Sequence, residues 1–203
     1  GDSATSQSFI ISTGISVKFD IESGEFDPKE TFVVHGEAHK DNGKSFNGYV
    51  IFEVQGFSLN ISQQIVNGTF SFPITIPENM PSLLYTARIN VYEKDSYGNI
   101  INEGEAFNTF RVRQIASDLD IALNVINITP GNELIYTVLL TDQSKVYMED
   151  DVHIEIKDSS GDVKSELLAR AGIAQSFKTI ENITPGLWTI KASYNEIFTE
   201  KTF

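Results

Sequence analysis

The sequence predicts an all-β protein made of two repeated β-sandwich domains. The first observation is an internal repeat, because residues 81–91 and 185–194 both combine a proline, a short approach and a strand with large apolar residues at alternate positions. Aligning Tyr85 with Trp188 gives an offset of 188 − 85 = 103 residues, a length typical of one sandwich domain. The second observation is the chain length of 203 residues, which is long for one sandwich and sufficient for two.

The repeated strand has the alternation expected of a half-buried antiparallel strand. Side chains at every second position of a strand share one face, and the intervening residues here are polar. The apolar positions are Tyr85, Ala87, Ile89 and Val91 in the first copy and Trp188, Ile190, Ala192 and Tyr194 in the second. We predict that Trp188 packs in a core, facing the strand that contains Tyr136.

The elements before this strand follow the same repeat. A short apolar run at residues 9–11 and strict alternation over 15–21 predict the first strands, and residues 32–39 and 50–54 predict the next two. Counterparts in the second half lie 134 − 32 = 102 and 152 − 50 = 102 residues further on, at 134–140 and 152–156.

Turn signals divide the rest of the first half. Asn67-Gly68 tolerates positive φ angles and predicts a type I′ hairpin between strands at 59–66 and 69–76. Residues 95–99 predict a turn, and 106–112 a closing strand. After a lapse at 113–118 the alternation resumes at Leu119, Ile121, Leu123 and Val125, too soon for a free linker.

One segment is ambiguous. Over residues 162–174, Val163, Leu167, Ala171 and Ala174 also fit a helical period. We favour strands because a turn at 159–161 and Gly172 bound the segment. The alternative is a single mixed domain with a helix at 162–174.

The proline-led approach to an aromatic strand, with the turn Asp95-Ser96-Tyr97-Gly98-Asn99, resembles immunoglobulin-like and macroglobulin-like modules of bacterial or archaeal surface and secreted proteins. The resemblance implies an all-β fold of two tandem immunoglobulin-like β-sandwich domains, residues 1–114 and 115–203. Such modules serve as adhesin stalks, S-layer building blocks, spacers in exported enzymes and protease-inhibitor scaffolds. The chain has no cysteine, so the macroglobulin thioester is excluded for this segment.

Composition narrows the classes of partner. The net charge is −13, from 15 Lys and Arg against 28 Asp and Glu, and an acidic surface repels phosphate backbones. We therefore expect no nucleic-acid partner. No apolar run approaches the roughly 20 residues of a membrane span, so we expect no membrane insertion within this segment. The lack of cysteine also excludes disulfides and thiol nucleophiles.

Two groups of residues have side chains that could bind a metal ion. His35, Glu37 and His39 alternate on the outward face of one strand, at a spacing from which imidazole and carboxylate can share a metal. Residues 149–151, with Asp118 and Asp120, offer carboxylates of the kind that bind calcium. We favour an exposed polar strand and solvated acidic loops, and predict no metal, cofactor or catalytic residue.

We predict no enzymatic activity, because no nucleophile, phosphate-loop or zinc motif occurs and His153 has outward parity. Tyr97 and Tyr147 are the aromatic residues expected to be exposed in loops. Four Asn-x-Ser/Thr triplets offer slight support for export, at Asn60, Asn67, Asn127 and Asn182.

The function predicted is a noncatalytic structural or adhesive module of an exported cell-surface protein, such as an S-layer, stalk or adhesin segment. Its expected partners are other modules of the same or neighbouring surface proteins, and its expected location is extracellular or at the cell surface. The alternatives are a carbohydrate- or protein-binding module, with Tyr97 and Tyr147 as contacts, and an accessory domain of a larger secreted enzyme.

Overall fold

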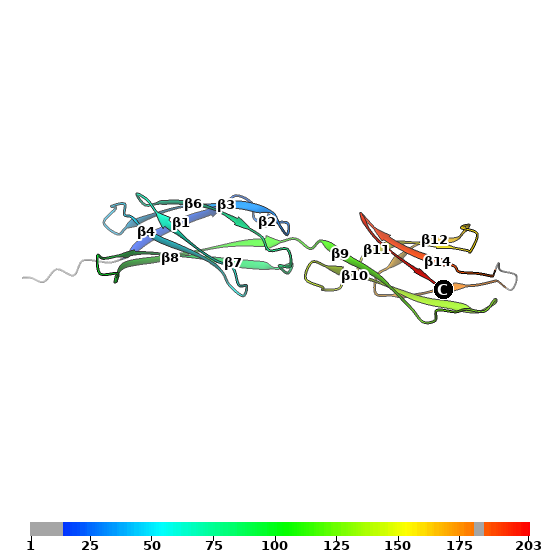
Figure 1. Ribbon diagram of the computed structural model, residues 1–203. Coiled ribbons are helices and arrows are strands. Elements are labelled where there is room, and N and C mark those ends of the chain that lie inside the picture. The colour runs from blue at the N-terminus through cyan, green and yellow to red at the C-terminus, as the bar shows by residue number, and fades with distance from the viewer. Residues whose placement is uncertain (1–13, 181–184) are drawn as a thin grey trace, which may run out of the picture. The chain divides into compact units, whose positions relative to one another are not determined.

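A computed structural model describes residues 14–180 and 185–203, and these residues form fifteen strands and no helix (Figure 1). The chain separates into two compact units, unit 1 (Gly1–Arg113) and unit 2 (Gln114–Phe203). The apolar run predicted at residues 9–11 and the triplet at Asn182 lie outside the described residues. The all-β prediction is confirmed.

Unit 1 has two sheets, one ordered β1-β3-β6 and the other β2-β8-β7-β4-β5. Neighbouring strands are antiparallel except β2 and β8, which are parallel. The strands are β1 (Ile15–Ile21), β2 (Glu25–Phe26), β3 (Thr31–Lys40), β4 (Gly48–Val54), β5 (Asn60–Ile65), β6 (Thr69–Thr75), β7 (Leu84–Lys94) and β8 (Ile100–Val112).

The core of unit 1 lies between the inner faces of its sheets, as in a β-sandwich. The rings of Phe52 in β4 and Phe72 in β6 pack edge to face with centroids 6.1 Å apart. The rings of Phe26 and Phe32 stack with centroids 4.2 Å apart. Contacts of this kind between rings add to the free energy of burial. Of the predicted inward positions of β3, β4 and β7, Gly36 is half-buried and the others are buried. The buried ones are Phe32, Val34, Ala38, Val50, Phe52, Val54, Tyr85, Ala87, Ile89 and Val91.

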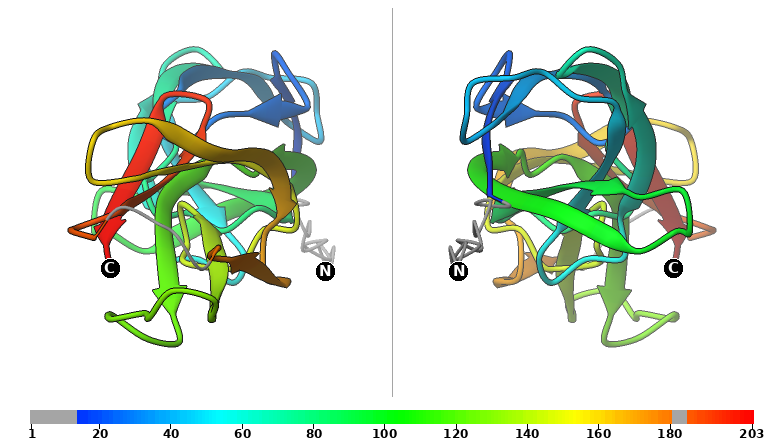
Figure 2. Two further views of the ribbon diagram at one scale, coloured as in Figure 1. Left: turned by 90° about the vertical axis from the view of Figure 1, so that its right-hand side faces the viewer. Right: turned by 90° about the vertical axis from the view of Figure 1, so that its left-hand side faces the viewer.

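Unit 2 repeats this arrangement without a counterpart of β2. Its sheets are ordered β13-β10-β9 and β12-β11-β14-β15. The hairpin of β14 and β15, drawn in orange and red in Figure 2, lies beside β9, the first strand of the unit. The strands are β9 (Ala116–Leu123), β10 (Glu133–Asp142), β11 (Asp151–Lys157), β12 (Val163–Arg170), β13 (Ala174–Lys178), β14 (Thr189–Tyr194) and β15 (Ile197–Thr202).

Trp188 is buried in unit 2, as its parity predicts. Its ring packs against the rings of Phe177 of β13 and Phe203, with ring centroids 6.0 and 6.2 Å away. Only 5% of the residue is exposed. Phe177 pairs with Leu134 of β10, the strand that also contains Tyr136. The tryptophan therefore faces the sheet that the sequence predicts.

The hairpin predicted at Asn67-Gly68 is corrected by the strand pairing. The turn is present, with φ of 52° and 76° and hydrogen bonds between Val66 and Thr69 in both directions. Beyond this bridge β5 pairs with β4, and β6 pairs with β3 in the other sheet. Pro73 lacks a backbone N–H, which confines β6 to a sheet edge. The turn thus carries the chain from one sheet to the other.

Two strand limits also differ from the prediction. β8 begins at Ile100 rather than residue 106, because it pairs with β7 as far as Lys94. β9 ends at Leu123, so Val125 lies outside the strand and is exposed. The segment 162–174 forms β12 and the start of β13, which excludes the helical alternative.

Candidate functional site

The most distinctive surface of unit 1 is a pair of tyrosines on the outer face of its five-stranded sheet. Tyr49 of β4 and Tyr92 of β7 are direct partners in the ladder. Their rings stack with centroids 5.4 Å apart, and Lys94 Nζ lies 5.7 and 5.4 Å from the two centroids. Cross-strand alternation brings these side chains together, and the ammonium is attracted to the ring faces.

A shallow hollow of about 400 Å³ adjoins this tyrosine pair. Amides, an ammonium and a carboxylate surround its aromatic wall, which suits a polar ligand with a flat face, such as a sugar. The lining residues are Asn47, Gly48, Tyr49, Gln64, Ile65, Val66, Lys94 and Asp95.

Asp95 also builds the turn that presents Tyr97. Its Oδ1 accepts hydrogen bonds of 2.9 Å from the N–H groups of Tyr97 and Asn99, and its Oδ2 accepts one of 3.1 Å from Asn99 Nδ2. The Asn99 side-chain bond, followed by the backbone bonds, lowers the pKa of Asp95. Gly98 provides the positive φ of 90° that this turn requires. Tyr97 is 90% exposed, as the sequence predicts.

Among the described residues of unit 2, the same turn follows Asp142 and Asp158, and sequence reasoning missed the first of them. Asp142 Oδ1 accepts from the N–H groups of Ser144 and Val146 at 2.8 and 3.0 Å, and Asp158 holds residues 160 and 162 in the same way. The residue with positive φ is Lys145 in one turn and Gly161 in the other. Tyr147 follows the first turn and is exposed, as predicted. The sequence signal for this kind of turn is local: it is an aspartate at the end of a strand, directly before the turn residues.

His35 and His39, considered above as metal ligands, lie near different carboxylates. His35 Nε2 lies 3.8 Å from Glu22, and His39 Nε2 lies 3.8 Å from Glu37. No three His, Cys, Asp or Glu side chains converge as metal ligands within residues 14–180 and 185–203.

The acidic residues considered as calcium ligands meet several donors. Glu149 and Asp151 both lie near Arg170, at 3.9 and 3.8 Å. Asp118 pairs with Lys145 at 3.3 Å, and Asp120 with Lys201 at 2.9 Å. Asp150 accepts a hydrogen bond of 2.6 Å from the hydroxyl of Tyr194, which lowers the pKa of the carboxyl. These residues are therefore spread over separate contacts instead of gathered in one site.

One polar row in unit 2 resembles a nucleophile with its base. His153 Nε2 lies 2.8 Å from Glu166 Oε1, and its Nδ1 lies 3.5 Å from Ser193 Oγ. The row crosses the outer face of a sheet, where β11 pairs on both sides and β14 pairs with β11 and β15. Because their backbone N–H groups are used in these ladders, the row lacks the convergent donors of an oxyanion hole. We interpret it as a cross-strand polar row.

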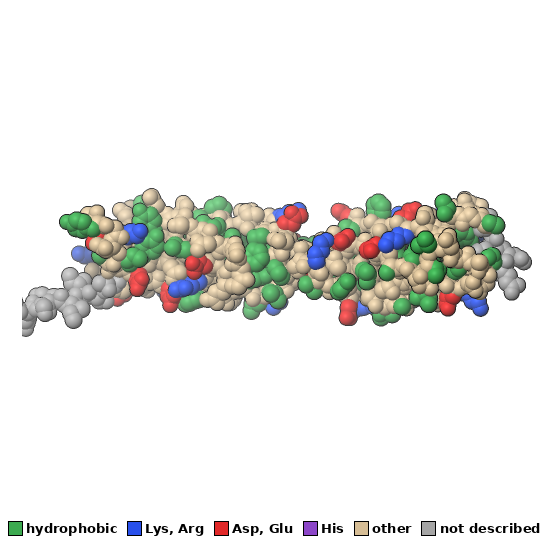
Figure 3. All heavy atoms as spheres, turned by 60° about the horizontal axis from the view of Figure 1, so that its bottom comes forward, with side chains coloured by type: hydrophobic (Ala, Val, Ile, Leu, Met, Phe, Trp, Pro, Cys, Tyr) green, Lys and Arg blue, Asp and Glu red, His purple; other side chains and the backbone are tan. Residues whose placement is uncertain are grey.

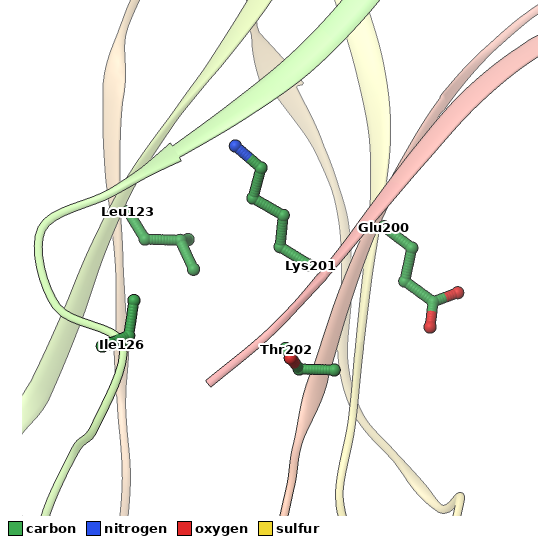
Figure 4. A pocket seen from close by; sticks show the side chains of 5 residues that line it. All are labelled: Leu123, Ile126, Glu200, Lys201 and Thr202. Atoms are coloured by element: carbon green, nitrogen blue, oxygen red, sulfur yellow. The ribbon is translucent and has the colours of Figure 1, made fainter.

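A second hollow separates β9 from β15 in unit 2. It is lined by Leu123, Ile126, Glu200, Lys201 and Thr202 (Figure 4). In Figure 4 the Lys201 side chain extends toward β9, where it pairs with Asp120, while Glu200 points the other way. The ion pair spans the two strand edges and offers no aromatic contact to a ligand.

Charged side chains on the face shown in Figure 3 are scattered, with acidic and basic groups interspersed among apolar ones. No helix among the described residues has the length and apolar character of a membrane span.

Comparison with known proteins places the chain in no family. No protein-family model matches it, and no curated protein matches it. Among solved structures, the chain is similar to the Yersinia pseudotuberculosis adhesin InvE, with 14% identity and a TM-score of 0.43. The match covers 94% of this chain and 59% of that chain.

Proposed function

We propose that the chain is a noncatalytic spacer or adhesive module of an exported cell-surface protein, built from two tandem immunoglobulin-like sandwiches with limits near residues 1–114 and 115–203. The observation that carries the proposal is the way the three residues between β8 and β9 are held. Arg113 Nε pairs with Asp27 of unit 1 at 2.6 Å. Gln114 Nε2 donates to Asp142 of unit 2 at 3.0 Å, and the Ile115 N–H donates to Gln143 Oε1 at 2.9 Å.

Such a junction leaves little free chain between the units. A flexible linker needs residues whose backbone is free to rotate, whereas each junction residue here is held by a contact within its own unit. Our proposal is that the connection is correspondingly stiff. A spacer needs this property, because it must hold whatever lies at its ends at a fixed separation. Our proposal places its partners among other modules of the same or neighbouring surface proteins.

The immunoglobulin-like assignment is supported by the sheet orders and by Tyr85. In both units a three-stranded sheet contains the first, second and fifth of the matched strands, and the facing sheet contains the others. Tyr85 lies at the start of β7, and its hydroxyl bonds back to the Pro81 carbonyl at 2.9 Å. A tyrosine bonded in this way at this strand is typical of immunoglobulin-like sandwiches.

The noncatalytic part of the proposal is supported by the histidines and aspartates, whose side chains are already paired with other residues of the chain. The histidines lie near single carboxylates, and Asp118, Asp120 and Asp150 are bound by separate donors. Hydrolysis of a substrate by the isolated chain would overturn this part.

Distance measurements between spin labels test the spacer. The chain has no cysteine, so labels can be attached at Ser62→Cys in β5 and Ser176→Cys in β13, both exposed. We expect a narrow distance distribution, and a broad one after three Gly-Ser dipeptides are inserted between Arg113 and Gln114. The same insertion after Ser96, in the turn of Tyr97, serves as the control and should leave the distribution narrow. A broad distribution in the parent chain would refute the spacer.

A second candidate function is ligand binding at the hollow lined by Tyr49 and Lys94. It is favoured by the exposure of Tyr97, which lies in the turn whose Asp95 also lines this hollow. Glycan-array binding tests it. A carbohydrate-binding module should lose its signal in Tyr97→Ala or Tyr49→Ala and keep it in Tyr147→Ala, which changes an exposed tyrosine of the other unit. Absence of binding in the parent chain would remove this candidate.

A further inference from the structure

Three polar residues converge at one end of the core of unit 1, at positions that face inward. Lys40 continues the buried face of β3 after Val34 and Ala38, two residues past the last apolar position. Glu93 does the same on β7 after Val91, and Asn102 lies opposite Glu93 in the β7–β8 ladder. Lys40 belongs to the three-stranded sheet and the other two residues belong to the facing sheet. The cluster therefore bridges the sandwich.

The carboxylate of Glu93 is the centre of this cluster. Lys40 Nζ lies 3.0 Å from Glu93 Oε1 and 2.8 Å from Oε2. Asn102 Nδ2 donates a hydrogen bond to Oε2 of the same carboxylate. The Lys40 and Glu93 side chains are 27% and 18% exposed, and Asn102 is half-buried. One carboxylate thus contacts both an amine and the nitrogen of a carboxamide.

The fold does not require this arrangement, as the other unit shows. The position that matches Lys40 in unit 2 is 40 + 102 = 142, an aspartate whose carboxylate is satisfied by its own turn and by Gln114. A shielded ammonium is costly compared with an apolar or neutral side chain. Lys40 and Glu93 are therefore candidates for a chemical role.

We propose that Lys40 and Asn102 form an isopeptide bond inside unit 1, with Glu93 as the proton relay. Glu93 accepts a proton from the Lys40 ammonium, and the neutral Nζ attacks Cγ of Asn102 to give a tetrahedral intermediate. Glu93 then delivers the proton to Nδ2, the Cγ–Nδ2 bond breaks, and ammonia leaves and takes up the second proton that Nζ must lose. The ammonium and the primary amide become one secondary amide plus ammonium, and no oxidant or cofactor is needed.

The geometry supplies what this reaction lacks in solution. The uncatalysed exchange of an amide is slow because the amine is protonated and the amide nitrogen is a poor leaving group. A carboxylate that contacts both nitrogens can deprotonate the first and protonate the second, and the folded sandwich holds the reactants together. Glu93 acts as a catalytic residue for a single turnover.

The bond would join β3 of one sheet to β8 of the other and close a loop of 102 − 40 = 62 residues. A cross-link of this kind restricts the unfolded chain, and it prevents the two sheets from separating under load. This consequence goes beyond the proposed function, since a spacer can act without it.

Intact mass measured on the denatured full chain tests the proposal. We expect the parent chain to be lighter than its sequence by one ammonia molecule, and a protease digest to contain a branched peptide that joins Lys40 to Asn102. Lys40→Arg keeps the charge but removes the primary amine, and Glu93→Gln removes the proton acceptor. Both variants should retain the full mass. Lys44→Arg, at an exposed lysine in the following turn, should lose ammonia like the parent.

Succinimide formation also releases ammonia, and three Asn-Gly pairs occur in unit 1, at Asn42, Asn47 and Asn67. A succinimide takes up water in mild alkali, whereas the isopeptide bond survives. A mass deficit that disappears in mild alkali, or a folded parent chain with its full sequence mass, would overturn the proposal. This readout comes from the parent chain, so it decides the question even where a variant does not fold.

Discussion

The hydroxyl of Tyr85 donates a hydrogen bond of 2.9 Å to the carbonyl oxygen of Pro81, four residues earlier in the chain. Tyr85 is 6% exposed and its ring stacks on that of Phe110 at 5.7 Å. The alternation of the strand predicts the buried ring but not the partner of the hydroxyl. The hydrogen bond holds the loop of Pro81 against the start of β7, and burial raises the pKa of the phenol.

Tyr85→Phe should therefore lower the free energy of unfolding of unit 1 by about 1–2 kcal/mol, because it keeps the ring and leaves the Pro81 carbonyl without its donor. Calorimetry of the full chain measures this as a lower midpoint for unit 1. Tyr97→Phe, at a residue that is 90% exposed, is the matched control and should leave the midpoint unchanged. Equal midpoints for Tyr85→Phe and the parent chain would contradict the prediction.

Trp188→Ala should destabilise unit 2 by about 3–5 kcal/mol, because it leaves a cavity between Phe177 and Phe203 that the sheets cannot fill. Trp188 is the one tryptophan of the chain, so the emission of the parent reports on it directly. Native emission should be blue-shifted and should move to the red as urea unfolds unit 2. A native spectrum already typical of solvated tryptophan would disprove the burial.

Unit 2 should lose stability in acid through Asp142. Burial would raise the pKa of this carboxyl, but the hydrogen bonds from Val146, Gln114 and Ser144 outweigh it and lower the pKa. A carboxyl with a lowered pKa in the folded state stabilises fully above its unfolded value of about 4, and the contribution is lost as the pH falls through the folded value.

Asp142→Asn should weaken the acid dependence of unit 2 by removing the part that Asp142 contributes. At neutral pH it should cost about 1–3 kcal/mol, since the charged acceptor of Gln114 is lost. Urea titrations followed by Trp188 emission at several pH values measure both effects. Asp162→Asn, at an exposed carboxylate of the same unit, should keep the acid dependence of the parent. If the stability of Asp142→Asn depended on pH as that of the parent does, the acid sensitivity would come from other groups and the prediction would be wrong.

Alternation was a reliable guide to the strands whose inner faces are apolar. Phe32, Val34 and Ala38 are buried where the pattern places them, because a strand with one apolar face has only one register that buries it. The same logic does not reveal partners. β5 and β6 are adjacent in sequence yet belong to different sheets, since each forms its ladder with a strand from an earlier part of the chain.

The polar cluster of Lys40, Glu93 and Asn102 illustrates why the candidate chemistry was missed. Each residue lies at the end of a strand, where a polar side chain is ordinary, and nothing local distinguishes it. Their convergence on one carboxylate depends on how the sheets face each other. The pairing of Tyr49 with Tyr92 likewise depends on which strands pair and in which register.

The turn at Asn67-Gly68 offers a test of its role as the crossing between sheets. Gly68 has φ of 76°, and a Cβ placed on it would lie 2.6 Å from the carbonyl oxygen of Ala38. Gly43 has nearly the same φ, 77°, and a Cβ there meets nothing within 4 Å. Both alanine variants suffer the penalty of the left-handed conformation, about 1–2 kcal/mol. Only Gly68→Ala must also move backbone atoms, because its N–H bonds the Phe46 carbonyl and its own carbonyl accepts from Ala38.

Gly68→Ala should therefore destabilise unit 1 by about 1–3 kcal/mol more than Gly43→Ala, the usual cost of forcing atoms into a packed site. Calorimetry of the two variants measures the difference, while Trp188 emission confirms that unit 2 is unchanged. If the turn were the tip of an ordinary exposed hairpin, the two glycines would be equivalent and both variants would unfold at the same temperature. Equal midpoints would thus reject the crossing and restore the simple hairpin, because the steric difference between the sites exists only if residues 67 and 68 lie against β3.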